Sequence, residues 1–148
     1  LDNGRKNVPA DPGLGYKRYD ISAGANYYWD AERSITTSAL WRTEFSGKTS
    51  ADIRPGQQLY LDWGVNKRWG PLQVGVIGAS QWQVSNDAGA GMTDQRSARH
   101  AVGAQISYIW LEPKIMLKAA WYRDVSVKAG NFVLPKGDTL RITFAKAF

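Results

Sequence analysis

Several residue types and patterns are missing from this sequence, and each absence excludes a class of chemistry. Cysteine is absent from the 148 residues, so disulfide bridges, cysteine metal sites and thiol catalysis are excluded. The single histidine, His100, cannot form a histidine-rich metal site. No apolar run approaches the roughly 18 residues that a membrane-spanning helix requires, and no Gly-x-x-x-x-Gly-Lys pattern for phosphate binding occurs. We therefore expect no metal and no other cofactor.

The charge of the chain is positive but dispersed. There are 19 Lys and Arg residues against 13 Asp and Glu residues, which gives a formal net charge of +6. Proteins that bind nucleic acids gather basic residues into a patch or a run, and no such run occurs here. We expect no nucleic-acid partner. Aromatic residues are instead plentiful, with seven Trp and seven Tyr, and both types are enriched at membrane interfaces.

The dominant pattern is an alternation of apolar and polar residues. From Tyr19 to Trp29 the odd positions are apolar or amphipathic, and the even positions Asp20, Ser22, Gly24 and Asn26 are polar or small. Successive side chains of a β-strand point to opposite faces, so such a segment has one apolar and one polar face. The pattern recurs in long segments, whereas globular strands have about five or six residues and membrane strands need about 9–11. The predicted strands are residues 16–29, 34–45, 58–69, 72–84, 98–110, 114–124 and 139–148.

The connections between these strands alternate in length. Short ones are predicted at Asp30–Arg33, Gly70–Pro71 and Leu111–Pro113, and long ones at about Ser46–Gln57, Ser85–Ser97 and Val125–Asp138. Short periplasmic turns and longer extracellular loops are typical of outer-membrane barrels. The sequence therefore predicts an all-β, antiparallel up-and-down transmembrane β-barrel, with residues 1–15 as an extracellular loop. An export signal is expected to be removed or encoded upstream of Leu1.

The number of strands indicates that the chain is part of a larger barrel. Single-chain bacterial barrels have an even number of strands, with eight as the minimum, and seven is odd. An open sheet would leave unpaired backbone groups in lipid at several kcal/mol each. We expect at least one strand of the barrel to be missing from these seven. The alternatives are an eighth strand hidden in the first fifteen residues or one that comes from a second chain.

The tryptophans support a membrane location. Trp29, Trp69 and Trp110 each precede a short turn on the apolar side of their strands, and Phe148 ends the chain at the same level. Together they predict an aromatic girdle at one membrane interface. A soluble β-sandwich or lipocalin-like barrel also alternates, but its apolar face points inward and its Trp residues are normally scattered.

The polar face is predicted to line the lumen. Its charges are of both signs, and each charge taken singly is expected to be paired, because unpaired charges are costly wherever water is scarce. Tyrosines on the same face could stack on an aromatic solute or serve only as packing. The lumen-lining candidates are Arg42, Glu44, Tyr60, Asp62, Arg68, Lys118, Tyr122 and Arg141.

No catalytic centre is predicted. His100 has Ser97 and Ser107 as the only serines nearby in the sequence, and both lie at odd separations that place them on the opposite face of a regular strand. Asp20 and Glu44 could be imagined as paired carboxylates of a glycosidase, but nothing in the sequence fixes their spacing. We therefore expect a protein that is not an enzyme.

Three stretches resemble a known family. They are Gly56–Gly64, Gly70–Gly78 followed by Gln81–Gly89, and Trp121–Asp124 followed by Gly137–Phe144. They are similar to the C-terminal half of outer-membrane proteins grouped as the "meta-pathway of phenol degradation" family. The resemblance covers most of the chain and implies a transporter-like barrel encoded near genes for aromatic catabolism. Its motifs mainly reflect barrel geometry.

The end of the chain resembles the targeting signal of bacterial outer-membrane barrels. Leu140, Ile142, Phe144 and the final Phe148 fit that pattern, and Lys146 departs from it. The resemblance implies the barrel-assembly machinery as a partner, with outer-membrane lipid and a small-molecule solute as the others.

The predicted function is an outer-membrane channel or uptake protein that passes small solutes by passive diffusion, aromatic compounds being one candidate class. Two alternatives stay open: a plugged structural or adhesive outer-membrane barrel, and a soluble ligand-binding β-barrel. The solute and the oligomeric state are not determined by the sequence.

Overall fold

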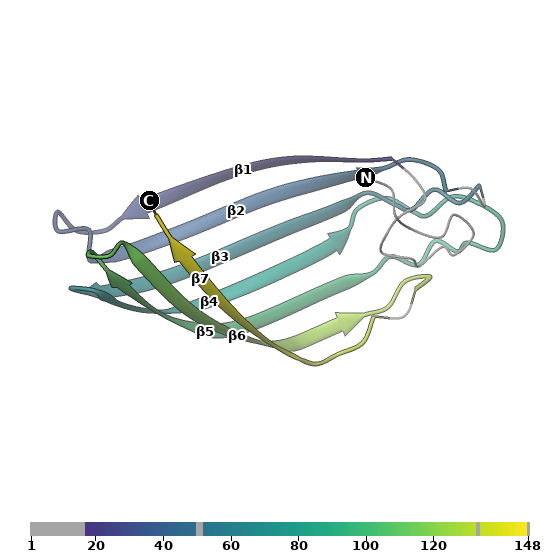
Figure 1. Cartoon of the computed structure of the whole chain (residues 1–148). Coiled ribbons are helices and arrows are strands. Elements are labelled where there is room, and N and C mark those ends of the chain that lie inside the picture. Colours follow the sequence, from purple (N-terminus) through teal and green to yellow (C-terminus); the bar gives the residue numbers. More distant parts are fainter. Residues whose placement is uncertain (1–16, 50–51, 133, 148) are drawn as a thin grey trace.

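The chain folds into one antiparallel sheet. The computed structural model describes residues 17–49, 52–132 and 134–147, and in these residues it contains seven strands and no helix (Figure 1). Their length agrees with the long alternating segments of the sequence. The strands are β1 (Arg18–Tyr28), β2 (Ile35–Ser46), β3 (Gln58–Trp69), β4 (Leu72–Gln83), β5 (Ala98–Trp110), β6 (Ile115–Lys128) and β7 (Asp138–Lys146).

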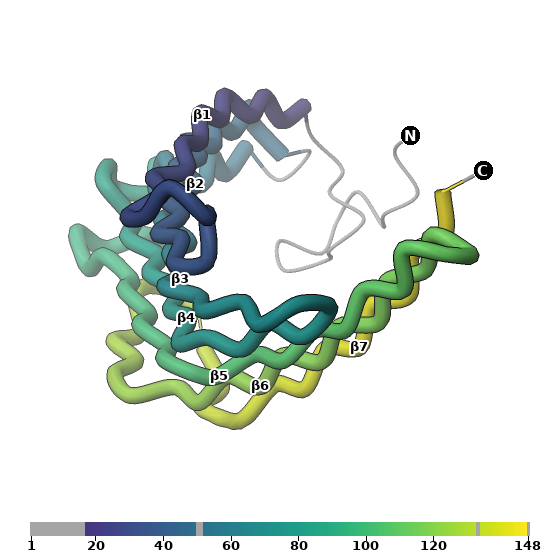
Figure 2. Tube along the Cα trace, turned by 90° about the vertical axis from the view of Figure 1, so that its left-hand side faces the viewer, coloured from purple at the N-terminus to yellow at the C-terminus, as the bar shows by residue number. Residues whose placement is uncertain are grey.

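The strands follow one another in sequence order across the sheet. Each strand pairs antiparallel with the next, in the order β1-β2-β3-β4-β5-β6-β7, which confirms the predicted all-β, up-and-down fold. Seen end-on, the sheet curls into a C-shaped trough with β1 and β7 at its two edges (Figure 2). No pairing joins β1 to β7 among the described residues, so the described sheet is open.

The connections place two kinds of end on the trough. One end carries the short connections after Tyr28, Trp69 and Trp110, and we call it the turn end. The opposite end carries the three long connections and is called the loop end (Figure 1). The last residue of β7, Lys146, pairs with Ile115, the first residue of β6. The last strand of the described sheet, β7, therefore ends at the turn end.

The tightest connection follows from its two residues. Trp69 pairs directly with Leu72, so only Gly70 and Pro71 form the turn. Gly70 has a φ of +55°, a conformation that residues with a side chain adopt at a cost, and proline fixes φ near −65°. A positive φ followed by a negative one is the pattern of a type II′ turn, whose twist matches that of the paired strands. This turn sets the register of the β3–β4 pair.

Strand β6 is longer than the sequence pattern predicted. It continues to Lys128, whereas the alternation predicted an end at residue 124. The register with β5 shifts between His100 and Ala101, because His100 pairs with Ser126 and Ala101 pairs with Asp124. Val125 is thus an extra residue, a β-bulge that breaks the alternation without ending the pairing. The predicted loop at residues 1–15 and the girdle residue Phe148 lie outside the described residues.

The exposure of apolar and polar side chains in this sheet is the reverse of that in a soluble domain. Among the described residues, the only buried hydrophobic residues are Ile77 and Ala120. Buried polar or charged residues outnumber them, and large apolar side chains such as Ile21, Ile142 and Phe144 are more than 60% exposed. A water-soluble sheet buries its apolar face against another layer. Here the described apolar face, on the convex side, has no covering layer.

Trp63 shows how the convex face is packed. A Cβ atom placed on Gly78 would lie 2.3 Å from Cε2 of the Trp63 ring, so the ring occupies the space above Gly78 on the neighbouring strand. Gly78 pairs with Trp63 across the β3–β4 ladder.

In the part of the chain that the structure describes, no helix is long and apolar enough to cross a membrane.

Candidate functional site: the concave face

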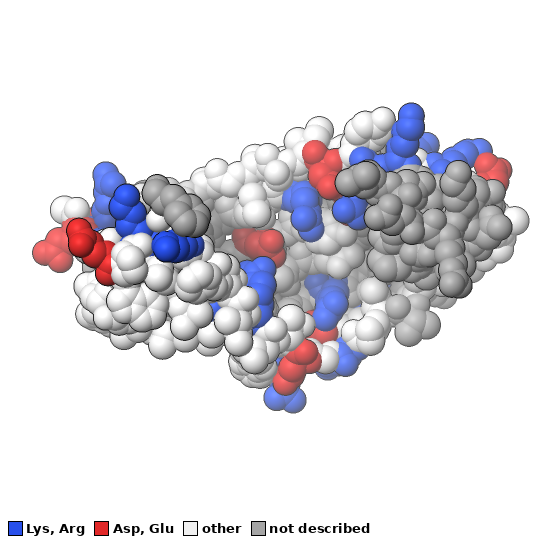
Figure 3. All heavy atoms as spheres, viewed as in Figure 1, with Lys and Arg blue, Asp and Glu red and all other residues white. Residues whose placement is uncertain are grey.

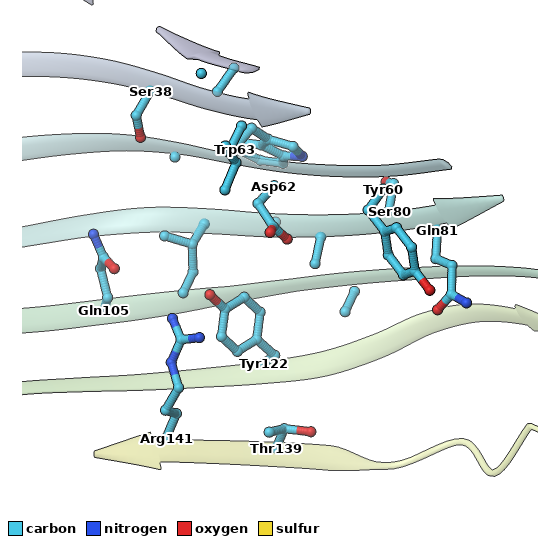
Figure 4. A pocket seen from close by; sticks show the side chains of 18 of the residues that line it. Ser38, Tyr60, Asp62, Trp63, Ser80, Gln81, Gln105, Tyr122, Thr139 and Arg141 are labelled. Carbon is cyan, nitrogen blue, oxygen red and sulfur yellow. The ribbon is translucent and has the colours of Figure 1, made fainter. Parts of the chain in front are cut away.

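The eight lumen candidates of the sequence all lie on the concave face of the trough. Tyr60, Asp62, Lys118, Tyr122 and Arg141 line a hollow of about 690 Å³ (Figure 4). The other three share that face through the strand register. These are Arg42, which pairs with Tyr60, Glu44, which contacts Tyr60, and Arg68, which is linked to Lys118 by the row of pairs through Gln73 and Ser107.

Arg68 lies apart from the other candidates. It borders a second hollow, of about 630 Å³, at the turn end, together with Glu32 and Trp110. No ion pair of Arg68 occurs among the described residues. The structure therefore separates Arg68 from the main hollow, although the alternation alone groups them.

A charged cluster lies on β1, β2 and β3 near the loop end. The hydroxyl of Tyr60 donates a hydrogen bond of 3.2 Å to Oε2 of Glu44. The guanidinium of Arg18 lies 3.6 Å from the other Glu44 oxygen, and the guanidinium of Arg42 lies over the Tyr60 ring, 4.4 Å from its centroid. Glu44 is buried, and its charge is balanced by these neighbours. The cluster ties the first three strands together on the polar face.

A second pair of charged side chains lies on β5 and β6. Arg99 donates two hydrogen bonds of 2.8 Å to the two oxygens of Asp124, the bidentate geometry that suits a guanidinium and a carboxylate. Asp124 also accepts a hydrogen bond of 3.0 Å from the backbone N–H of Gly137. Its side chain is only 2% exposed. Asp124 is thus fully engaged, and it anchors the start of β7 to β6.

Lys118, Arg141 and Asp62 differ from these paired charges. None of them makes a hydrogen bond or an ion pair with any other described residue. Figure 3 looks into the open side of the trough, where basic and acidic side chains are visible in the hollow. Figure 4 shows Arg141 and Tyr122 extending from the neighbouring strands β7 and β6 into the same hollow. Asp62 lines this hollow from β3. Among the described residues, Lys118, Arg141 and Asp62 are therefore the charged groups of the hollow that make no hydrogen bond or ion pair.

The predicted girdle residues lie on the convex face at the turn end. Trp29, Trp69 and Trp110 are 64%, 54% and 40% exposed, and all three adjoin short connections. The indole N–H of Trp29 donates a hydrogen bond of 2.7 Å to the Thr37 hydroxyl. Lys67 lies beside Trp69, and its ammonium is 5.9 Å from the centre of that ring. An apolar ring with a polar edge is the arrangement that suits a boundary between oil and water.

The histidine has a partner that the sequence did not predict. Nδ1 of His100 lies 3.0 Å from the hydroxyl of Ser80, its paired residue on β4, and the imidazole packs edge-on against Trp82. Ser97 and Ser107 are not its partners. The pair lies on the convex face, and no carboxylate contacts His100 among the described residues. It therefore lacks the third group that orients a catalytic histidine.

Sequence reasoning missed a polar cluster that joins the three long connections. Asp87 is buried and accepts hydrogen bonds from the backbone N–H of Gly56 at 2.7 Å, from Gln83 at 2.9 Å and from Asn131 at 2.7 Å. Asn131 also accepts hydrogen bonds from the backbone N–H and the hydroxyl of Thr93. The loops are thus linked at one buried carboxylate. A run of Asn, Asp and Gly residues marks a loop but does not reveal such a contact.

The concave face carries no recognisable metal site. No group of three or more His, Asp or Glu side chains that could hold a metal ion occurs in the described ranges.

Comparison with known proteins identifies the family of the chain. The chain matches the family described as "Putative MetA-pathway of phenol degradation" over residues 1–144. It belongs to this family, as the resemblance of its sequence motifs predicted. No curated protein and no solved structure matches the chain.

Proposed function

We propose that this protein is an outer-membrane channel or uptake protein for small solutes, acting by passive diffusion and without catalysis. The observation that carries the proposal is the inverted sheet: exposed apolar side chains cover the convex face, and charged and polar side chains line the concave face. A lipid-facing exterior and a wet interior are the requirements of a spanning barrel. The family description supports aromatic compounds as one candidate class of solute.

The distribution of charge on the convex face supports the membrane part of the proposal. The charged residues that the described register places on this face lie near strand ends: Lys67 and Lys146 near the turn end, and Arg123, Lys128 and Asp138 near the loop end. The strand centres carry residues such as Val65, Val76 and Ala104. Charges cost about 2–4 kcal/mol at the bilayer midplane and much less near the interfaces. A soluble ligand-binding barrel has no need of this distribution.

The test of the channel is electrical. The protein, purified in detergent from its native cells, is added to a planar lipid bilayer and the current is recorded. We expect discrete steps of conductance that scale with salt concentration. A protein that cofractionates with outer membranes but never conducts would contradict the channel and favour a plugged barrel.

The loop cluster favours that second candidate, a barrel whose interior is closed and whose long loops bind partners. Because three connections meet at Asp87, the loops are held together rather than free to move. Asp87→Asn replaces an acceptor with an amide that cannot satisfy all three donors, and it should loosen the loops by about 1–3 kcal/mol. Asp94→Asn is the control, since Asp94 is an exposed carboxylate of the same connection.

The plugged barrel and the open channel differ in how their conductance should respond when the loops are loosened. In a plugged barrel held shut by the loops, Asp87→Asn should raise conductance, and Asp94→Asn should not. In an open channel, both variants should conduct like the wild type, although Asp87→Asn should be cleaved faster by proteases in the three loops.

A further inference from the structure

Two basic side chains without acidic partners stand beside a tyrosine in the main hollow. Lys118 and Tyr122 lie on β6 on either side of Ala120, and Arg141 pairs with Ala120 from β7. All three side chains line the hollow. The register therefore sets Arg141 beside Ala120, at a level between Lys118 and Tyr122.

The nearby acid does not neutralise this group. Asp124 is the next residue of β6 on the concave face after Tyr122, but both of its oxygens are occupied by Arg99, and one also by the N–H of Gly137. Asp62 lines the same hollow from β3, and no ion pair joins it to Lys118 or Arg141. With Arg99 and Asp124 cancelling, the charged residues that line the hollow leave two positive charges against one negative charge.

We propose that Lys118, Arg141 and Tyr122 form a binding site for the carboxylate of a small aromatic acid. The guanidinium of Arg141 offers a planar fork of donors that matches a carboxylate, and the ammonium of Lys118 adds charge from the neighbouring position. The ring of Tyr122 provides a flat apolar surface against which an aromatic solute can stack.

The size of the hollow fits a solute of this class. At about 690 Å³ it lies within the range of small-molecule sites, which is roughly 300–1,000 Å³. Tyr60, on the far side of the same hollow, already stacks with Arg42 and donates its hydroxyl to Glu44. Tyr122 makes no such contacts with described residues, so its ring is the one left for a ligand.

The inference rests on the proposed function, since a lumen open to solutes gives the acid its access, and the experiment separates the two. Binding is measured by calorimetry on the protein purified in detergent, with benzoate, benzyl alcohol and acetate as probes. We expect benzoate to bind at least tenfold more tightly than benzyl alcohol, which keeps the ring but lacks the charge, and than acetate, which lacks the ring. Equal binding of benzoate and benzyl alcohol would overturn the site, and this comparison requires no variant.

Variants identify the residues. Arg141→Gln and Lys118→Gln should each weaken benzoate binding at least tenfold, while Arg141→Lys, which keeps the charge but loses the fork, should weaken it less. Asp62→Asn should tighten binding by removing a like charge. Arg123→Gln is the matched control, because Arg123 lies on β6 and on the opposite face, where it pairs with Asp138. An equal effect of Arg141→Gln and Arg123→Gln would also overturn the site.

Conductance is recorded for the same preparations. If the protein conducts but does not discriminate benzoate from benzyl alcohol, the inference fails and the channel stands. If benzoate binds as expected but neither the wild-type protein nor any variant conducts, the binding site stands and the proposed function fails.

Discussion

At the scale of single residues, the face of the sheet on which a side chain lies determines its exposure more than its residue type does. Val76 and Ile77 are adjacent in the sequence and similar in chemistry, yet Val76 is 56% exposed on the convex face and Ile77 is 5% exposed on the concave wall. Glu44 and Asp124 are buried, which is rare for acids unless they are paired. The polar wall satisfies these groups through Tyr60 and Arg99. The concave face therefore carries paired polar groups, and the convex face carries exposed apolar side chains.

Val76 tests this assignment. It lies near mid-strand, between Val65 and Ala104 on the neighbouring strands. Val76→Arg should therefore place a charge in the centre of the convex face, which the proposed function turns towards lipid. We expect the free energy of unfolding in lipid vesicles to fall by about 2–4 kcal/mol. Ala79→Arg is the matched control on the same strand, because Ala79 lines the hollow opposite Asp62, and it should cost much less. Equal losses in a denaturant titration would show that the faces are wrongly assigned.

The residue contacts that sequence reasoning missed share a physical cause. A two-residue turn such as Gly70–Pro71 fixes which residues of its two strands pair. The connection between Gln83 and Ala98 is long, and a long loop leaves that register undetermined. The pairing of Ser80 with His100 depends on it, as do the donors that meet at Asp87. Alternation predicts the face of a residue, but the neighbour across the sheet comes only from the register.

At the scale of elements, the strands could be predicted because their signal is long and regular. Each described strand has at least nine residues, so period two stands out against chance. The prediction failed where one residue breaks the period, at the bulge of Val125, after which β6 continues to Lys128. The eight lumen candidates were placed on one face by alternation alone. Which of them are paired and which stand free required the structure.

The first short turn provides a prediction at this scale. The carboxylate of Asp30 accepts hydrogen bonds from the hydroxyl of Ser34 and, at 3.0 Å, from the backbone N–H of Ile35. These bonds, the Ser34 hydroxyl foremost, lower the pKa of Asp30 below its usual 3.8. The charged form is favoured in the folded turn, so the stabilisation is complete above pH 3.8 and is lost as the pH falls through the lower folded-state pKa.

Asp30→Asn should therefore lower the denaturant midpoint at pH 7 and have a smaller effect at about pH 2, where more of the wild-type carboxylate is protonated than at pH 7. Glu32→Gln is the control, since Glu32 lies in the same turn and makes no hydrogen bond with described residues. A difference between wild type and Asp30→Asn that is as large at pH 2 as at pH 7 would contradict the assigned role.

At the scale of the whole molecule, the two ends of the trough should face different compartments. The short connections lie at one end and the long ones at the other, and in outer-membrane barrels the long loops face outward. Single cysteines at Lys48 and Ala90 should react on intact cells with a reagent that does not cross membranes. A cysteine at Glu32 should react only after the cells are broken. Equal labelling at all three positions would be incompatible with the proposed orientation.

The two edges of the sheet place a condition on its closure into a barrel. With an odd number of antiparallel strands, β1 and β7 run in the same direction, from the loop end to the turn end. Direct closure of β7 on β1 would give a parallel pair, and so would two copies of this sheet inserted in the same orientation. An antiparallel barrel requires an odd number of additional strands between the two edges.

The 148-residue chain on its own should therefore not form the closed, stable structure of an outer-membrane barrel unless an additional strand comes from residues outside those the structure describes. Unpaired backbone groups cost several kcal/mol each in lipid, and β1 and β7 would expose a row of them. We expect the isolated chain, refolded in detergent, to be protease-sensitive or aggregated and to migrate on a gel at the same position before and after boiling. A compact monomer that resists protease and shifts on boiling would mean that the seven strands and the remaining residues suffice for closure.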